Sequence, residues 1–187
     1  MYGNTDLDVL NKGDEADSWV YDQLSSEALN YLQQLPMSLR VTPKDGHSPT
    51  DDLLIVHSTP RSCYELLIVQ PHPRGVGDRM KILTPEDEVQ AMLCGERANL
   101  MVYGHIHFIS EGTVNGQRIA SVGSVGLPFD GDHRAAYAVA EWDGENWSLD
   151  HHRVAYDHLT VEQAIQSSEM PMKERWATMI KHAQWLP

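Results

Sequence analysis

Apolar residues recur along this chain with two spacings, and each spacing predicts a different kind of element. Leucines three residues apart within 25–35 predict a helix that a serine caps and Pro36 ends. Residues 84–94 predict a second helix, because a proline and acidic residues open the segment and a glycine follows it. Short apolar or alternating runs predict strands at 37–42, 53–56 and 99–103.

The second half of the chain has a different texture. Two alternating segments flank the Asn-Gly pair at 115–116, which predicts a β-hairpin, and a second hairpin is predicted around the DGEN turn at 143–146. Apolar periodicity returns at about 160–168 and 172–185 and predicts two terminal helices. The order favours a mixed α/β protein with layered sheets. Residues 1–155 are then the core, and 156–187 a C-terminal helical extension packed on it.

Two segments carry no clear periodicity. Residues 7–22 are acidic and are interpreted as a loop. Residues 61–83 are interpreted as a long surface loop, a feature that compact domains usually keep for function. Arg61 and Arg74 in this loop are candidates to contact a phosphate.

Composition narrows the function classes. The 187 residues are 41% hydrophobic, enough for a packed core, and the N-terminus has no signal-peptide pattern. The net charge of −13 argues against extended nucleic-acid binding, and no apolar run is long enough to span a membrane. The two cysteines are expected to be free thiols in a reducing cytoplasm.

Candidate chemistry gathers at the ends of the predicted strands. His57 follows the apolar run 53–56, and His105 and His107 follow the run that ends at Tyr103. In extended backbone, His105 and His107 would point to the same face. Asn4 and Asp6 lie in a glycine-led GNTD segment, where Asn4 offers an oxygen and Asp6 either orients a ligand or stabilises a turn. Taken singly, the H-x-H pair is more often two solvated histidines, and GNTD more often an ordinary turn, than part of a metal site.

Taken in order, these motifs match a known pattern. GNTD, the apolar strand with HSTP, the YGHIH segment and SVGSVGLP together resemble the calcineurin-like metallophosphoesterase superfamily, and more closely its small bacterial and archaeal phosphodiesterases. The resemblance spans about residues 1–155. It implies a four-layer αββα sandwich of two packed sheets flanked by helices. It also implies hydrolysis of phosphomonoester or phosphodiester bonds by a water activated at a dinuclear metal site.

The resemblance implies roles for particular residues. Asn4, His57 and His105 would bind one divalent ion, and His107 would bind the other, the metals being Mn, Fe, Zn or Ni. The family often has a histidine after the asparagine as proton donor, and this chain has Thr5 there. Asp6 or a water is then the candidate donor. The implied substrate is a phosphorylated small molecule or a nucleotide.

The chain departs from the family at its start. The D-x-H and G-D-x-x-D motifs, which supply further ligands and the bridging aspartate, are not found ahead of GNTD. The DGH at 45–47 lies in a predicted turn and is rejected as a substitute. We therefore expect an N-terminally truncated form of the fold, with only one ion in this chain as an alternative to two. A sheet edge left exposed would favour pairing in a homo-oligomer.

Two alternatives to an active phosphoesterase stay open from the sequence. One is a remnant of the same fold that binds a metal or a partner without turnover. The other is a cupin-type β-barrel with a single metal, because His105, His107 and Glu111 have the spacing of part of that motif.

Overall fold

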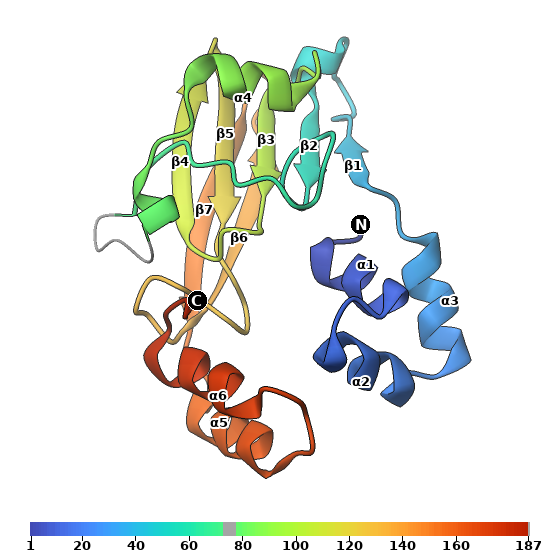
Figure 1. Ribbon diagram of the computed structural model, residues 1–187. Helices are drawn as coiled ribbons and strands as arrows, with labels where there is room; N and C mark the ends of the chain where they lie inside the picture. Colours follow the sequence, from blue (N-terminus) through green and yellow to red (C-terminus); the bar gives the residue numbers. More distant parts are fainter. Residues whose placement is uncertain (73–77, 187) are drawn as a thin grey trace.

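The computed structural model describes residues 1–72 and 78–186 of the chain. Within them, a five-stranded sheet has the order β1-β2-β3-β5-β4, and a separate hairpin of β6 and β7 lies behind it (Figure 1). The expected mixed α/β class is confirmed. The strands are β1 (Ser38–Val41), β2 (Leu53–Val56), β3 (Leu100–Tyr103), β4 (Ile109–Val114), β5 (Gln117–Val122), β6 (Ala135–Trp142) and β7 (Trp147–Val154).

The centre of the large sheet is parallel. β2 pairs with β3, and β3 with β5, in parallel registers, whereas β1 and β4 are antiparallel edge strands. β2 and β3 are short and almost wholly buried, as their continuous apolar sequences predict. Because β2 and β3 run in the same direction, their carboxyl ends open at one edge of the sheet, where ligand sites commonly form.

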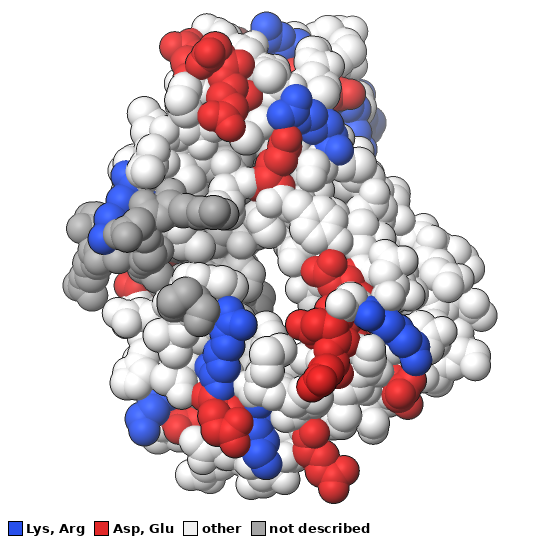
Figure 2. Space-filling view, viewed as in Figure 1, with Lys and Arg blue, Asp and Glu red and all other residues white. Residues whose placement is uncertain are grey.

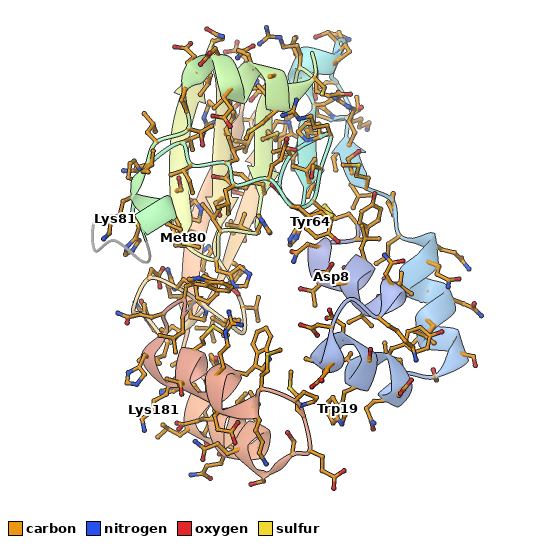
Figure 3. All side chains as sticks on the ribbon, in the orientation of Figure 1. Asp8, Trp19, Tyr64, Met80, Lys81 and Lys181 are labelled. Carbon is orange, nitrogen blue, oxygen red and sulfur yellow. The ribbon has the colours of Figure 1, made fainter. Side chains whose placement is uncertain are left out.

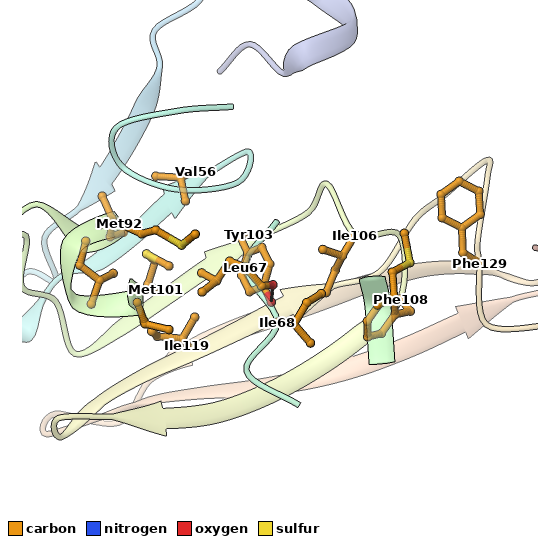
Figure 4. Close-up of a cluster of buried hydrophobic side chains, with 14 of the residues drawn as sticks. Val56, Leu67, Ile68, Met92, Met101, Tyr103, Ile106, Phe108, Ile119 and Phe129 are labelled. Carbon is orange, nitrogen blue, oxygen red and sulfur yellow. Dashed lines mark hydrogen bonds between the residues drawn. The ribbon is translucent and has the colours of Figure 1, made fainter. Parts of the chain in front are cut away.

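Alternate residues of these strands enter two different cores. On one face, Leu54, Met101 and Ile119 pack with the buried side of α4 (Glu86–Leu93) and with the segment that contains Leu67 (Figure 4). The buried Tyr103 hydroxyl donates to the carbonyl oxygen of Leu67 at 2.7 Å, which satisfies that polar group inside the core.

The other face of the large sheet packs on the β6–β7 hairpin. Leu53, Leu100 and Ala120 meet Trp147 in a second apolar cluster, so the expected packing of two sheets is present. The outer face of the hairpin is more open. On that face three apolar side chains are about half exposed: Tyr137 (45%), Val139 (40%) and Val154 (51%). No helix among the described residues covers these three side chains, although the expected four-layer sandwich has a helical layer on this side.

The acidic N-terminal segment forms helices, and the loop prediction for residues 7–22 was wrong. The helices are α1 (Asn4–Asn11), α2 (Glu15–Gln23) and the expected α3 (Ser26–Gln34). Asp14 caps α2 by accepting from the backbone of Asp17 at 2.9 Å. Apolar periodicity misses these helices because they bury so little, Val9 in α1 and Ala16 in α2.

The two predicted terminal helices are α5 (His158–Ser167) and α6 (Lys173–His182). They pack on the rest of the molecule: Met179 is fully buried in the core of the large sheet, and Trp185 contacts Phe129 edge-on. The division of the chain at residue 155 stays a prediction. No helix within residues 1–72 and 78–186 is long and apolar enough to cross a membrane.

In its described part, the long loop predicted at 61–83 is largely irregular, as expected. It contains a one-turn helix at Asp78–Lys81, and residues 73–77, including Arg74, lie outside the described residues. A further one-turn helix is Pro49–Asp51.

The edge of β2 is covered by β1, whose own residues are all exposed, including Leu39 and Val41. Pairing of this edge with another chain stays a prediction.

Candidate metal centre

Three of the predicted site residues converge from three separate elements. Asn4 is the first residue of α1, His57 directly follows β2, and His105 lies two residues beyond β3. The backbone N–H of Gly104 donates to the His57 carbonyl at 2.9 Å. This bond holds the two strand ends together, and with them the two histidines.

The donor atoms of these residues form a tight triangle. Asn4 Oδ1 lies 2.8 Å from His57 Nε2 and 3.2 Å from His105 Nδ1, and the two ring nitrogens are 3.2 Å apart. The rings meet edge to face, with centroids 5.1 Å apart. One neutral oxygen and two imidazole nitrogens therefore face a common point. We call Asn4, His57 and His105 the triad.

The GNTD segment is the start of a helix and not a free turn. Gly3 is the N-terminal cap of α1, and the Asp6 carboxylate accepts its backbone N–H at 2.7 Å. A Cβ on Gly3 would lie 2.7 Å from Nδ1 of His57, so glycine is needed for the ring to approach. Asp6 makes the structural contact anticipated for it; its catalytic role stays a prediction. Thr5 is exposed on the first turn.

The prediction that His105 and His107 lie in extended backbone was wrong. Both residues are left-handed, with φ of 56° and 60°, and follow β3 in a bend. The reason lies between them, where Ile106 is fully buried in the apolar core. Left-handed backbone at two non-glycine residues costs about 1–3 kcal/mol each and persists only where surrounding packing enforces it.

His107 is anchored differently from the triad. Its Nδ1 donates to the carbonyl oxygen of Leu127 at 2.7 Å, and its ring stacks on Phe129 with centroids 4.4 Å apart. This bond assigns the proton to Nδ1 and leaves Nε2 as the unprotonated nitrogen. Among the described residues, His107 forms no hydrogen bond with the triad, although its charge would lower the pKa of both His57 and His105.

Burial keeps the histidines neutral. Loss of solvent lowers the pKa of His57, and the nearby His107 lowers it further. For His105, burial followed by the two neighbouring histidines lowers the pKa to about 4. Burial also lowers the pKa of His107. Neutral imidazole is the form that binds a metal ion.

The comparisons with known proteins point to one fold. No family model and no curated protein sequence matches the chain. A solved metallophosphoesterase from Sphaerobacter thermophilus is similar in structure over 97% of this chain and 75% of its own, with a TM-score of 0.66 and 20% identity. A hypothetical protein from Pyrococcus horikoshii is similar over 98% and 71%, with a TM-score of 0.67 and 18% identity.

The chain has the metallophosphoesterase fold. This finding excludes the cupin-type barrel, because the large sheet is mixed and open, with the order β1-β2-β3-β5-β4. Glu111, which that alternative required near His105 and His107, is exposed and pairs with Arg118 at 3.0 Å.

The triad suits one divalent ion in the metallophosphoesterase fold. Two donors bound at about 2.1 Å with a right angle between them lie roughly 3.0 Å apart, close to the separations observed here. Imidazole and amide donors suit several transition metals. No group of three or more His, Cys, Asp and Glu side chains within residues 1–72 and 78–186 is placed to hold a metal, so the first ion depends on Asn4 as a third donor. A second ion fits less well, because His107 forms no hydrogen bond with the triad and bonds instead to the carbonyl of Leu127.

Several other residues that the sequence suggested as functional make contacts elsewhere and not with the triad. Arg61 pairs with Glu65 at 2.6 Å. His133 donates through Nε2 to the carbonyl oxygen of Lys181. The DGH segment lines a separate cavity through Asp45 and His47. Conversely, sequence reasoning missed Asp8, which accepts from Asn4, and Tyr64, which donates to Asp8. The i,i+4 spacing from Asn4 would have indicated Asp8 had α1 been predicted.

Proposed function

We propose that this chain hydrolyses phosphomonoester or phosphodiester bonds in a metal-dependent reaction centred on the triad. The proposal is carried by one observation: Asn4, His57 and His105, which are far apart in the sequence, bring three neutral donor atoms within 3.2 Å of one another. The fold shared with the Sphaerobacter metallophosphoesterase supports the same class of chemistry.

The triad residues would act as ligands and not as acids or bases. A divalent ion held there, whether Mn, Fe, Zn or Ni, would supply Lewis acidity and a nucleophilic water at neutral pH. The low pKa of His57 and His105 suits this role, because neither ring needs to release a proton before it binds. The substrate would be a phosphorylated small molecule or a nucleotide.

His107 would face a second ion through Nε2. Its bond to Leu127 and its stacking on Phe129 hold the ring in place, as partners of a metal-binding histidine commonly do. A bridging carboxylate would have to come from elsewhere than the described residues of the same copy of the chain. One source is a second copy of the chain, as in the homo-oligomer expected from the sequence.

The proton donor for the leaving group would be Asp6 or a water. Thr5 occupies the position after Asn4 and carries no group that is acidic near neutral pH. Asp6 lies near enough to His57 to raise that pKa, and its carboxylate already caps α1. A donor role for Asp6 would therefore require one carboxyl group to serve both purposes.

A second candidate function is metal binding without turnover. It is favoured by the incomplete donor set around His107, since two ions about 3.5–4 Å apart repel strongly without a bridging anion. The same triad would then hold a single ion in a protein that binds a partner.

The test combines calorimetry with an activity assay. Manganese binding to the native chain is measured by isothermal titration, and turnover with bis-p-nitrophenyl phosphate and p-nitrophenyl phosphate at saturating manganese. We expect both to be lost in His105→Ala and His57→Ala, and retained in His47→Ala, whose histidine lines a separate cavity. Binding without turnover would select the second candidate, and a native chain that binds no manganese would overturn both.

A further inference from the structure

Tyr64 is joined by one hydrogen bond to α1, the helix that carries Asn4 of the triad. It lies in the loop that follows β2 and points toward Asp8 of α1 (Figure 3). Its hydroxyl donates to Asp8 Oδ1 at 2.7 Å. Tyr64 therefore connects the loop after β2 to the helix that begins at Asn4.

Two buried hydroxyl groups hold the loop that carries Tyr64 in place. Ser58 and Thr59 are 0% and 1% exposed, and both hydroxyls bond within the loop. The Ser58 hydroxyl donates to the carbonyl oxygen of Glu65, and the Thr59 hydroxyl donates to the Glu65 carboxylate at 2.7 Å. These bonds place Tyr64 firmly even though its own side chain is half exposed.

Asp8 transmits the contact to Asn4. Its Oδ2 accepts from Nδ2 of Asn4 at 3.5 Å, one helical turn away on α1. A carboxylate only accepts hydrogen bonds, so it selects the N–H end of the Asn4 amide. The oxygen end must then point the other way, toward His57 and His105.

We propose that Tyr64 is a positioning residue for the metal centre: its hydroxyl holds Asp8, which turns the Asn4 oxygen toward the two histidines. The expected effect on metal affinity rests on the proposed function. The orientation of the Asn4 amide does not, because it is present in the metal-free protein too. The raised pKa of Tyr64, about 12 and due first to the bond with Asp8, is consistent with a neutral hydroxyl donor at physiological pH.

The test uses Tyr64→Phe, which removes the hydroxyl and keeps the ring and the backbone. Manganese affinity, measured by isothermal titration, should fall about tenfold, at the lower end of the range for residues that orient metal ligands. The melting temperature should stay near the native value. Tyr31→Phe is the matched control, since Tyr31 is 65% exposed on α3, and it should bind manganese like the native chain. Native affinity in Tyr64→Phe overturns the proposal.

A double-mutant cycle asks whether the hydroxyl acts through Asp8. Asp8→Ala should weaken manganese binding at least as much as Tyr64→Phe. Adding Tyr64→Phe to Asp8→Ala should then cost nothing further, because coupled residues give non-additive effects. Fully additive losses would overturn the proposed relay.

A third readout needs no metal and separates this inference from the proposed function. The side-chain amide of Asn4 is observed by ¹⁵N NMR in the metal-free protein. In Tyr64→Phe its signals should move toward those of a solvent-exposed amide, while Tyr31→Phe leaves them unchanged. A native chain that binds no manganese would overturn the proposed function, and unmoved Asn4 signals would overturn the positioning role.

Discussion

The two halves of the predicted dinuclear centre are built very differently. The half that contains Asn4, His57 and His105 comes from the ends of two adjacent parallel strands and the start of a helix, and its donors already touch. The half that contains His107 consists of one ring stacked on Phe129 and bonded to a loop carbonyl. Yet His105 of the first half and His107 of the second follow the same strand, only two residues apart.

The difference shows what organises a metal centre before any metal binds. Parallel strand pairing aligns the residues after β2 and β3, and the bond between Gly104 and His57 holds them together. His107 has no comparable neighbour among the described residues. Acidic side chains gather over α1 and α2 on the face of the molecule shown in Figure 2, but the bonds of Asp6 and Asp8 commit them to the helix cap and to Tyr64. We expect the triad to bind its ion alone.

The largest difference between the two halves should be seen when a histidine of the triad is removed and manganese affinity is measured. His57→Ala takes away one of three converging donors and should weaken manganese binding more than a hundredfold, beyond the loss typical of residues that only support ligands. His107→Ala should change the same affinity less than about threefold. Isothermal titration of both variants checks this. Similar losses in the two would mean that the ion lies between the halves.

The next largest effect should be a loss of stability in acid, through His105 of the triad half. The folded-state pKa of His105, about 4, lies below the ordinary value of 6.5, so the native state binds fewer protons than the unfolded state. The metal-free chain should keep full stability above pH 6.5 and lose about 2 kcal/mol from this residue as the pH falls toward 4, after allowance for partial solvent exposure.

Urea unfolding at pH 7.0, 5.5 and 4.5 measures this loss. The matched variant is His105→Asn, because asparagine tolerates the left-handed backbone at this position. It should show a shallower decline in stability over the same range. An identical decline in the two proteins would assign the acid sensitivity to other groups.

A methyl group on Gly3 should disturb only the triad. In Gly3→Ala the new Cβ would lie 2.7 Å from Nδ1 of His57, so the ring must shift away from Asn4. We expect manganese affinity to fall about tenfold, by analogy with the loss of a ligand-orienting contact. Gly126→Ala is the control, because a Cβ there meets nothing within 4 Å. Equal affinity in both variants would show that the ring adapts without cost.

The smallest effect should come from the other half. Phe129→Leu removes the ring that stacks on His107 and should cost about 1 kcal/mol of stability, the scale of an aromatic pair. Affinity for the first manganese ion should not change. Thermal unfolding and calorimetry on the same sample check both statements. A large loss of affinity would mean that the position of His107 matters for the triad after all.

The sequence alone determined much of this protein. Local patterns determined both hairpins, the helices α3 to α6 and the buried strands, because an apolar pattern, a turn pair or helix start and stop residues mark each of them. They also pointed to Asn4, His57, His105 and His107 as candidates, because each stands at a strand end or beside a glycine.

Only the tertiary structure decided how those residues meet. The helices α1 and α2 bury too little to show a period, so the position of Asn4 on a helix and its contact with Asp8 could not be read from spacing. The left-handed backbone of His105 and His107 follows from the burial of Ile106, which no local pattern reveals. The triad closes because β2 and β3 pair in parallel across more than 40 residues of intervening chain, and such pairing depends on the whole core.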